Sequence, residues 1–297
     1  MSRQLIRVHC FSDPGCPWGY SASPALAVLS WRYGAQLDWR LVTIGLTEDH
    51  REYERRGYTA TRMAQAYRSF RRYGMPFSVE PRSRLLATGR ACRAIVATRL
   101  LFPEREWSVY RALQFAWFTS GLMLDEDDDL ATALGSVRDV DPAAVMAAID
   151  SPEVAVAYAA DRAAARSAAG TPTEFQGKAA QTDGAVRYTA PSLVFERGDV
   201  RLEAGGFQPV EAYDVLLANL DSTLERRDAP ADPAEVLERF PDGLTTQEVA
   251  AIMRSGNDAA DRGAAEGALI DMAAARRARR VAMGDEALWH SDAEVAA

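Results

Sequence analysis

The residue of this 297-residue chain best suited to covalent chemistry is Cys16, in the segment Asp-Pro-Gly-Cys-Pro-Trp-Gly-Tyr at 13–20. The segment directly follows the apolar run 5–11, and Pro17 suits the first position of a helix because its missing N–H would have no partner there. Cys16 is therefore expected at the amino end of a helix, where unpaired N–H groups and the helix dipole favour an anion. We expect its thiol to ionise easily, with a pKa lowered from about 8.5 into the range of roughly 3.5–7.5.

The spacing around Cys16 limits this chemistry to a single thiol. Gly19 occupies the position at which a Cys-x-x-Cys motif carries its second cysteine. Attack by Cys16 on a disulfide or an electrophile would therefore give a mixed adduct that another thiol must release. The other two cysteines, Cys10 and Cys92, lie in apolar segments and are interpreted as core residues rather than as resolving thiols. A buried and inert Cys16 is the alternative interpretation.

Two neighbours of Cys16 and a distant proline complete the candidate site. Asp13 either acts as an acid or base toward Cys16 or caps free N–H groups of the helix, which is the commoner role of such a residue. Trp18 is expected partly in the core and partly in the wall of a pocket, where an indole can stack on a planar substrate. Pro191 opens the strand pattern 191–196, and a proline there suggests a cis peptide that leaves the preceding backbone free to pair with an extended ligand.

Other polar clusters are weaker candidates. The acidic run 125–129 fits no metal-loop spacing and precedes a helix, where acidic residues are favoured, and the three histidines are dispersed, so we expect no metal site. Arg68, Arg71 and Arg72 could meet an anionic cofactor or substrate, although a solvated helix face is the favoured interpretation. The loop 170–174 is expected to be a plain connection, with a mobile rim of the site as the alternative.

The periodicity of apolar residues predicts an α/β protein interrupted by a helical insertion. A strand–helix–strand unit at the start of the chain implies a parallel pair of strands, and a hairpin followed by a helix closes the same region. The predicted strands of this region are 5–11, 36–46, 191–196 and 201–203, and its predicted helices are 17–33 and 209–220. The predicted helices of the insertion are 59–73, 83–102, 104–120, 127–134, 142–149 and 151–169.

The carboxy-terminal part of the chain has the order of elements found in a winged-helix domain. Helical patterns at 234–240, 245–254 and 258–276 precede a hairpin pattern at 279–290, and the third helix takes the place of a DNA-recognition helix. Acidic residues outnumber arginines from position 233 onward, whereas duplex binding needs positive charge. We therefore expect this part to mediate dimerisation or to pack over the active-site face.

The overall composition excludes several classes of protein. The apolar fraction of 48% is enough for a sizeable core, and the net charge of −8 argues against a general binder of nucleic acid or anionic membranes. No stretch of the sequence approaches 18 uninterrupted apolar residues, and the amino-terminal residues lack a signal-peptide pattern, so we expect a cytoplasmic protein. Three cysteines are too few for a disulfide framework.

The segments 13–18, 189–194 and 206–213, with the helical region between them, resemble the DsbA-like branch of the thioredoxin superfamily over residues 4–221. That branch includes dithiol oxidoreductases, mycothiol- or glutathione-dependent reductases, kappa-class glutathione transferases and hydroxychromene carboxylate isomerases. The resemblance implies a thioredoxin fold over 1–57 and 187–221, interrupted by a large all-helical insertion over 58–186. Together with the linker composition of 222–233 and the order of elements over 234–297, this predicts an α/β protein with a small winged-helix-like domain at its carboxy-terminal end.

The resemblance also implies roles for individual residues. Cys16 matches the nucleophilic position and Pro191 the cis-proline. The residues implied to receive a low-molecular-weight thiol, mycothiol or glutathione, are Pro17, Thr189, Ala190, Pro191, Gly206, Phe207 and Gln208.

Two departures from the family pattern shape the expected function. Dithiol members have cysteine where this chain has Gly19, and the transferases and isomerases usually have serine where it has Cys16. We expect a monothiol oxidoreductase or transferase that acts on a disulfide or electrophilic substrate with a small thiol and no metal, and a homodimer is a further expectation. The alternatives are a thiol-dependent isomerase or biosynthetic enzyme for an aromatic substrate, and a non-catalytic, redox-responsive binding protein.

Overall fold

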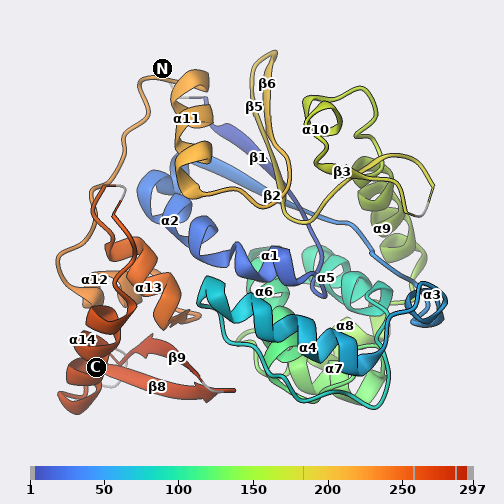
Figure 1. Cartoon of the computed structure of the whole chain (residues 1–297), viewed down its shortest axis with the longest axis horizontal. Coiled ribbons are helices and arrows are strands. Elements are labelled where there is room, and N and C mark those ends of the chain that lie inside the picture. Colours follow the sequence, from blue (N-terminus) through green and yellow to red (C-terminus); the bar gives the residue numbers. More distant parts are fainter. Residues whose placement is uncertain (1–3, 183, 257, 285, 293–297) are drawn as a thin grey trace.

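A four-stranded sheet lies at the centre of the molecule (Figure 1). The computed structural model describes residues 4–182, 184–256, 258–284 and 286–292. The central strand β1 (Ile6–Ser12) pairs in parallel with β2 (Leu37–Thr43) and antiparallel with β5 (Ser192–Arg197), which continues into the hairpin partner β6 (Val200–Ala204). The predicted parallel pair and the predicted hairpin are therefore both confirmed.

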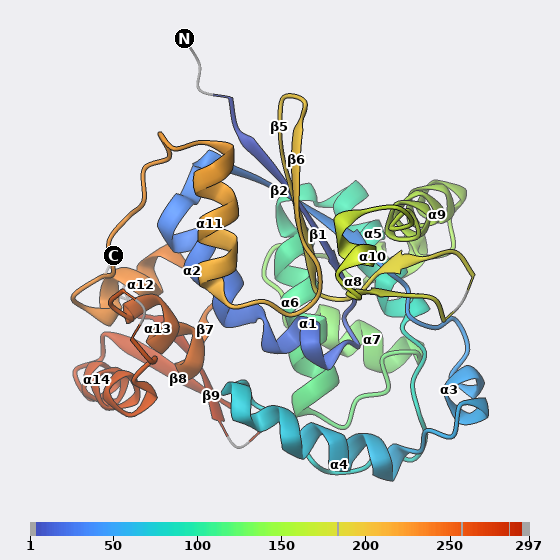
Figure 2. The same cartoon turned by 45° about the horizontal axis from the view of Figure 1, so that its top comes forward.

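Helices cover both faces of this sheet. Figure 2 shows α2 (Ser23–Tyr33) and α11 (Val210–Leu220) side by side on one face, while α5 (Gly89–Leu101) and α9 (Pro152–Ala165) lie on the other. The helix predicted over 17–33 is instead divided at Ala22 into α1 (Pro17–Ser21) and α2. Pro24, in the first turn of α2, has no N–H with which to continue the hydrogen bonds of α1.

The insertion consists of helices that run from one side of the sheet to beneath α1. Besides α5 and α9, the helices of the insertion are α4 (Ala60–Phe70), α6 (Glu106–Thr119), α7 (Asp127–Leu134), α8 (Pro142–Ala148) and α10 (Pro172–Phe175), and α3 (Arg51–Arg55) precedes it. The insertion is not entirely helical, because β3 (Ala179–Ala180) lies within it and pairs with β4 (Arg187–Tyr188) just after it. The sequence did not predict α3 or α10, which begins inside the expected loop 170–174. The predicted helix 83–102 starts only at Gly89, because the N–H groups of Thr88 and Gly89 both donate to Thr47 O.

The acidic run 125–129 binds arginines. Asp125 and Glu126 both pair with Arg84, and Asp127 pairs with Arg90.

Over the described ranges, no single helix is long and apolar enough to cross a membrane. The helices α8 and α9 reach that length and apolarity together, but the pair is bent by 78°.

The carboxy-terminal part follows the predicted order of helices and hairpin. It comprises α12 (Pro233–Arg239), β7 (Leu244–Thr245), α13 (Thr246–Met253), α14 (Arg262–Ala274), β8 (Ala278–Met283) and β9 (Glu286–Ser291). The strands form a second sheet in the order β7–β9–β8, in which the short strand β7 was not predicted. Assignment of this part to the winged-helix class stays a prediction.

A buried ion pair joins this part to the rest of the molecule. Glu248 of α13, with no exposed surface, accepts hydrogen bonds from the guanidinium of Arg111 on α6 at 2.6 and 3.2 Å and from the hydroxyl of Ser23 on α2. It also accepts from the backbone N–H of Thr245 at 2.8 Å. Burial by itself would raise the pKa of Glu248, but Arg111 and the other donors more than offset this, so that the pKa is lowered.

We expect Glu248→Gln to lower the free energy of unfolding by roughly 3–5 kcal/mol at pH 7, because it leaves the Arg111 charge without its partner. Since the folded-state pKa of Glu248 lies below the unfolded value of 4.5, its contribution is complete above that pH and is lost as pH falls through the folded-state pKa. Urea unfolding at several pH values measures both effects. Glu238→Gln on the exposed face of α12 is the control, expected to change stability by less than about 0.5 kcal/mol. A loss of unfolding free energy in Glu248→Gln as small as that in the control would contradict a stabilising role of the Arg111–Glu248 pair.

Candidate active site

The structure brings Cys16 to the cis-proline, although 174 residues separate Cys16 from Ala190. Cys16 is the N-cap residue of α1, and its Sγ donates a hydrogen bond to Ala190 O at 3.3 Å. The Ala190–Pro191 peptide bond is cis. The backbone N–H groups of Trp18 and Gly19 interact with the Cys16 sulfur. The site therefore places one thiol between a helix start and the loop before β5.

Burial dominates the acid–base behaviour of Cys16. Only 8% of the residue is exposed, and it packs in an apolar cluster with residues that include Phe11, Tyr188 and Ala190. This burial raises the pKa of Cys16 to about 11, although the N–H groups of Gly19 and Trp18 act in the opposite direction. The expectation of a lowered thiol pKa is therefore wrong for this structure. The N–H groups at the start of the helix lower the pKa of Cys16 as predicted, but the loss of hydration on burial raises it by more.

Asp13 anchors the turn that carries Cys16. Its side chain has no exposed surface, and its two oxygens accept from the backbone N–H groups of Gly15 and Leu46, each at 2.9 Å, and from the Thr88 hydroxyl at 3.1 Å. The predicted capping of the helix is wrong, because α1 has no side-chain cap. Burial raises the pKa of Asp13, and the Asp13 carboxylate in turn raises the pKa of Cys16.

The other two cysteines are inaccessible. Cys10 on β1 and Cys92 on α5 have no exposed surface, and none of the three cysteines is in a disulfide. The Cys92 Sγ donates to Asp13 at 3.5 Å. Burial raises the pKa of Cys10 to about 12 and that of Cys92 well above its usual value. Both residues thus belong to the core. Within the described ranges, no group of three or more His, Cys, Asp or Glu side chains could hold a metal ion.

Gly19 leaves no room for a side chain. A Cβ atom at this position would lie 2.6 Å from Ser12 Oγ and 3.7 Å from Tyr110 Oη. The Tyr110 hydroxyl donates to Ser12 Oγ at 2.6 Å, so the obstructing hydroxyl is held in place from α6. The space beneath α1 that a second cysteine would need is therefore taken by β1 and the insertion.

Trp18 lies in an aromatic cluster that combines three segments of the chain. Its ring centroid is 4.8 Å from that of Phe70, 5.7 Å from that of Tyr73 and 5.5 Å from that of Phe207, and 38% of Trp18 remains exposed. Phe207 was predicted at the site. Phe70 and Tyr73 were not, although their signal, two aromatic residues ending the helical pattern 59–73, was in the sequence. The cluster forms an exposed aromatic edge beside Cys16.

The basic residues after α4 do not converge on the thiol. The Arg71 guanidinium donates to Phe77 O at 2.8 Å, and that of Arg72 lies 4.9 Å from the centre of the Tyr73 ring. Arg68 is exposed on α4. Arg68 therefore lies on a solvated helix face, as interpreted from the sequence, whereas Arg72 borders the aromatic cluster.

The predicted cofactor residues of the two loops do lie together. Ser192 connects them, because its hydroxyl donates to Thr189 O at 2.7 Å and accepts from the backbone N–H of Gly206 at 3.0 Å. Gly206 has a φ of +71°, which favours glycine, and Gln208 braces the same loop by donating to Gly205 O at 2.9 Å. The cis-proline loop and the loop before α11 thus form one surface next to Cys16.

Lys178, the only lysine of the chain, borders this surface and was not predicted. Its carbonyl accepts from the Thr189 hydroxyl at 2.6 Å, and its side chain runs past Gly206, where an added Cβ would lie 3.3 Å from Lys178 Cδ. Lys178 is exposed and has no ion-pair partner among the described residues. Its ammonium group is therefore available to a ligand.

We expect alkylation of Cys16 by iodoacetamide to rise with pH up to about 11, since only the thiolate reacts and burial keeps the thiol protonated. Asp13→Asn should lower that inflection because it removes a neighbouring negative charge. Cys92→Ala is the matched control: it also removes one hydrogen bond to Asp13 but keeps the charge, so it should leave the inflection unchanged. Mass spectrometry of peptides from the folded protein measures the rates. A wild-type inflection below about 8.5 would contradict the dominance of burial.

Comparison with known proteins agrees with this geometry. The model of the DSBA-like thioredoxin domain matches residues 7–190, more than half of the chain. No curated protein matches the sequence. Among solved structures, a "putative protein disulfide isomerase" from Nitrosomonas europaea has a TM-score of 0.56 and 20% sequence identity to this chain. The match covers 73% of this chain and 97% of the isomerase chain. The cytosolic disulfide reductase DsbM from Pseudomonas aeruginosa has a TM-score of 0.51 at 19% identity, covering 73% and 100%.

A third structure, a "probable DsbA oxidoreductase" from Streptomyces coelicolor, has a TM-score of 0.53 at 16% identity and covers 76% of this chain and 95% of its own. At these identities the likeness concerns the fold. The match of the family model over the segment that contains both Cys16 and Ala190 concerns the family itself. The chain belongs to the family of DSBA-like thioredoxin domains.

Proposed function

We propose that this protein is a monothiol thiol–disulfide oxidoreductase that uses Cys16 as its nucleophile and a small external thiol to complete each turnover. The observation that carries the proposal is the contact between Cys16 Sγ and Ala190 O at the cis-proline. Cys16 is also the only cysteine of the chain with any exposed surface. A disulfide that approaches the Trp18 edge would meet this sulfur first.

The reaction follows from the position of Cys16. Its proton is lost to solvent, the thiolate attacks one sulfur of a substrate disulfide, a new S–S bond forms to Cys16, and the second substrate sulfur leaves as a thiolate. The N–H groups of Trp18 and Gly19 stabilise the Cys16 thiolate before attack and after release. Because Cys10 and Cys92 are buried, a thiol from solution must attack the mixed disulfide, which releases the Cys16 thiolate and leaves the external thiol joined to the remaining half of the substrate. A second molecule of the external thiol then attacks this disulfide, so that the second half of the substrate leaves as a thiolate and the two external thiols end as one oxidised disulfide.

A raised pKa does not prevent this chemistry. The nucleophilicity of a thiolate increases with its pKa, so the small thiolate fraction at neutral pH is offset in part. The rate of the first step is expected to rise with pH toward the pKa of about 11.

The surface beside Cys16 suits an anionic peptide-like thiol. The N–H of Ala190 makes no hydrogen bond to any described residue, so it can pair with the backbone of a bound cysteinyl compound. Lys178 supplies an available positive charge next to the same loop, and Arg187 acts on Cys16 as a positive charge. Glutathione, which carries two carboxylates, fits these groups better than mycothiol, which is uncharged. We therefore propose glutathione as the external thiol.

Cys16→Ser should abolish the glutathione-dependent reduction of bis(2-hydroxyethyl) disulfide, because a hydroxyl cannot form the mixed disulfide. Cys10→Ala removes a buried thiol without touching the site and should retain most of the activity. The assay couples the oxidised glutathione formed to NADPH consumption through glutathione reductase. Turnover that survives in Cys16→Ser at the wild-type rate would assign the chemistry to the external thiol alone.

Lys178→Gln should raise the KM for glutathione several-fold and leave the KM for the neutral disulfide unchanged, since only the former carries carboxylates. Lys178→Arg keeps the positive charge and should retain a KM for glutathione close to that of the wild type. Initial rates at varied glutathione and fixed disulfide separate the two parameters. Equal KM values for glutathione in Lys178→Gln and the wild type would show that Lys178 does not select the thiol.

A further inference from the structure

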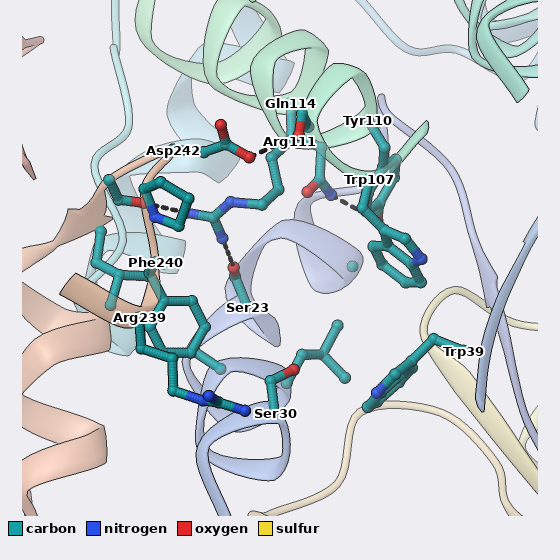
Figure 3. Close-up of a pocket in the computed structure, with 17 residues that line it drawn as sticks. Ser23, Ser30, Trp39, Trp107, Tyr110, Arg111, Gln114, Arg239, Phe240 and Asp242 are labelled. Carbon is teal, nitrogen blue, oxygen red and sulfur yellow. Dashed lines mark hydrogen bonds between the residues drawn. The ribbon is translucent and has the colours of Figure 1, made fainter. Parts of the chain in front are cut away.

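A cavity of about 280 Å³ lies where the three parts of the chain meet (Figure 3). Its walls come from α1 and α2, from Trp39 on β2, from α6, and from the segment Arg239 to Leu244, which runs from the last residue of α12 to the first of β7. This last segment lies outside residues 7–190, which the family model matches. The cavity is therefore completed by a part of this chain that the family domain does not contain.

The interior of the cavity is mainly apolar and has a defined shape. The indoles of Trp39 and Trp107 meet almost at right angles, with ring centroids 5.8 Å apart and planes at 81°. Figure 3 shows Phe240 across the cavity from these two indoles. All three side chains are only partly buried. A flat apolar ring bound in the cavity can thus contact Phe240 on one side and the two indoles on the other.

Most polar groups of the wall are already bound to other parts of the protein. Arg111 pairs with Glu248, Asp242 accepts from the Ser108 hydroxyl at 2.6 Å, and Gln114 donates to the Tyr110 hydroxyl at 2.8 Å. These groups hold the wall in place and leave few hydrogen bonds for an occupant.

Two polar side chains at the opposite end are different. The guanidinium of Arg239 and the hydroxyl of Ser30 make no side-chain hydrogen bond or ion pair with any described residue, and Figure 3 shows them at the same end of the cavity. The guanidinium of Arg239 lies near the end of α2, since an added Cβ on Gly34 would be 2.9 Å from its terminal nitrogen. Ser30 is one turn earlier on the same helix. The pair forms a cationic, hydrogen-bonding mouth to an apolar interior.

We propose that this cavity is a binding site for a small aromatic carboxylate, with its ring between Phe240 and the indoles and its carboxylate at Arg239 and Ser30. The volume lies just below the roughly 300–1,000 Å³ of ordinary small-molecule pockets, so the ligand has one or two rings. Gly19 of α1 forms part of the wall, so the ligand contacts the helix whose N-cap residue is Cys16. The proposal does not depend on the redox function.

The test is calorimetric titration of the full chain with naphthalene-2-carboxylate and with its neutral analogue naphthalene-2-carboxamide. The carboxylate should bind one to one and at least about tenfold more tightly, because a hydrogen bond to a charged partner is worth more than one to a neutral partner. Arg239→Gln, a change of an exposed residue, should remove this preference. Arg279→Gln, which changes an exposed arginine on β8 that does not line the cavity, should retain it. Ser30→Trp, which fills the mouth, should abolish binding of both compounds.

Three results would overturn the proposal. One is absence of binding to the wild type at millimolar concentration, and another is a carboxylate preference that survives in Arg239→Gln. The third is unchanged binding in a folded Ser30→Trp variant, which would place the compounds elsewhere, including at the Trp18 edge beside Cys16.

Discussion

The buried pair between Arg111 and Glu248 fixes the carboxy-terminal part against the rest of the chain, together with the pair between Arg254 and Glu211 and the hydrogen bond from Ser108 to Asp242. Removing two charges from water is costly, and the cost is offset here because the remaining donors and acceptors are satisfied: Ser23 bonds to both charges, and Thr245 donates to Glu248. Apolar surfaces tolerate small shifts in packing, whereas this network has one geometry. The carboxy-terminal part is therefore docked in a single orientation.

This docking reaches the active site through α2. Ser23 is in the first turn of α2, immediately after the break at Ala22 that ends α1. The start of α1 places Cys16 against Ala190, while the end of α1 is next to the serine that Arg111 and Glu248 hold. The same pair also borders the apolar cavity, whose walls include Ser23 and Arg111. The position of Cys16, the wall of the cavity and the docking of the carboxy-terminal part therefore all depend on the contacts of Arg111 and Glu248 with Ser23.

The sequence predicted the parts of the fold that depend on local pattern. The strand before Cys16, the parallel partner and the hairpin after Pro191 have clear periodicity and proline placement, and these elements formed as expected. The break at Ala22 could have been predicted from Pro24, which cannot continue a helix. The start of α5 could not, because it depends on hydrogen bonds to Thr47 from another segment.

The same distinction applies to the site. Residue types and spacing predicted Cys16 and Pro191 as site residues, and the family resemblance predicted Phe207. The pKa of Cys16 depends instead on how many apolar neighbours surround it, which spacing does not reveal. Asp13 was correctly placed beside Cys16, yet its partners come from two other segments, at Leu46 and at the start of α5. Lys178 and the cavity wall at Arg239 were missed because their importance arises only from tertiary proximity.

The steric position of Gly19 has a consequence for how such a protein can change over generations. A single codon change can place cysteine at position 19, but its Cβ would meet Ser12 Oγ, which Tyr110 of α6 holds by a hydrogen bond. A second thiol therefore becomes acceptable only after Ser12 or its tyrosine partner has already been replaced. The route from this one-thiol site to a two-thiol site is ordered, and its first step brings no catalytic gain.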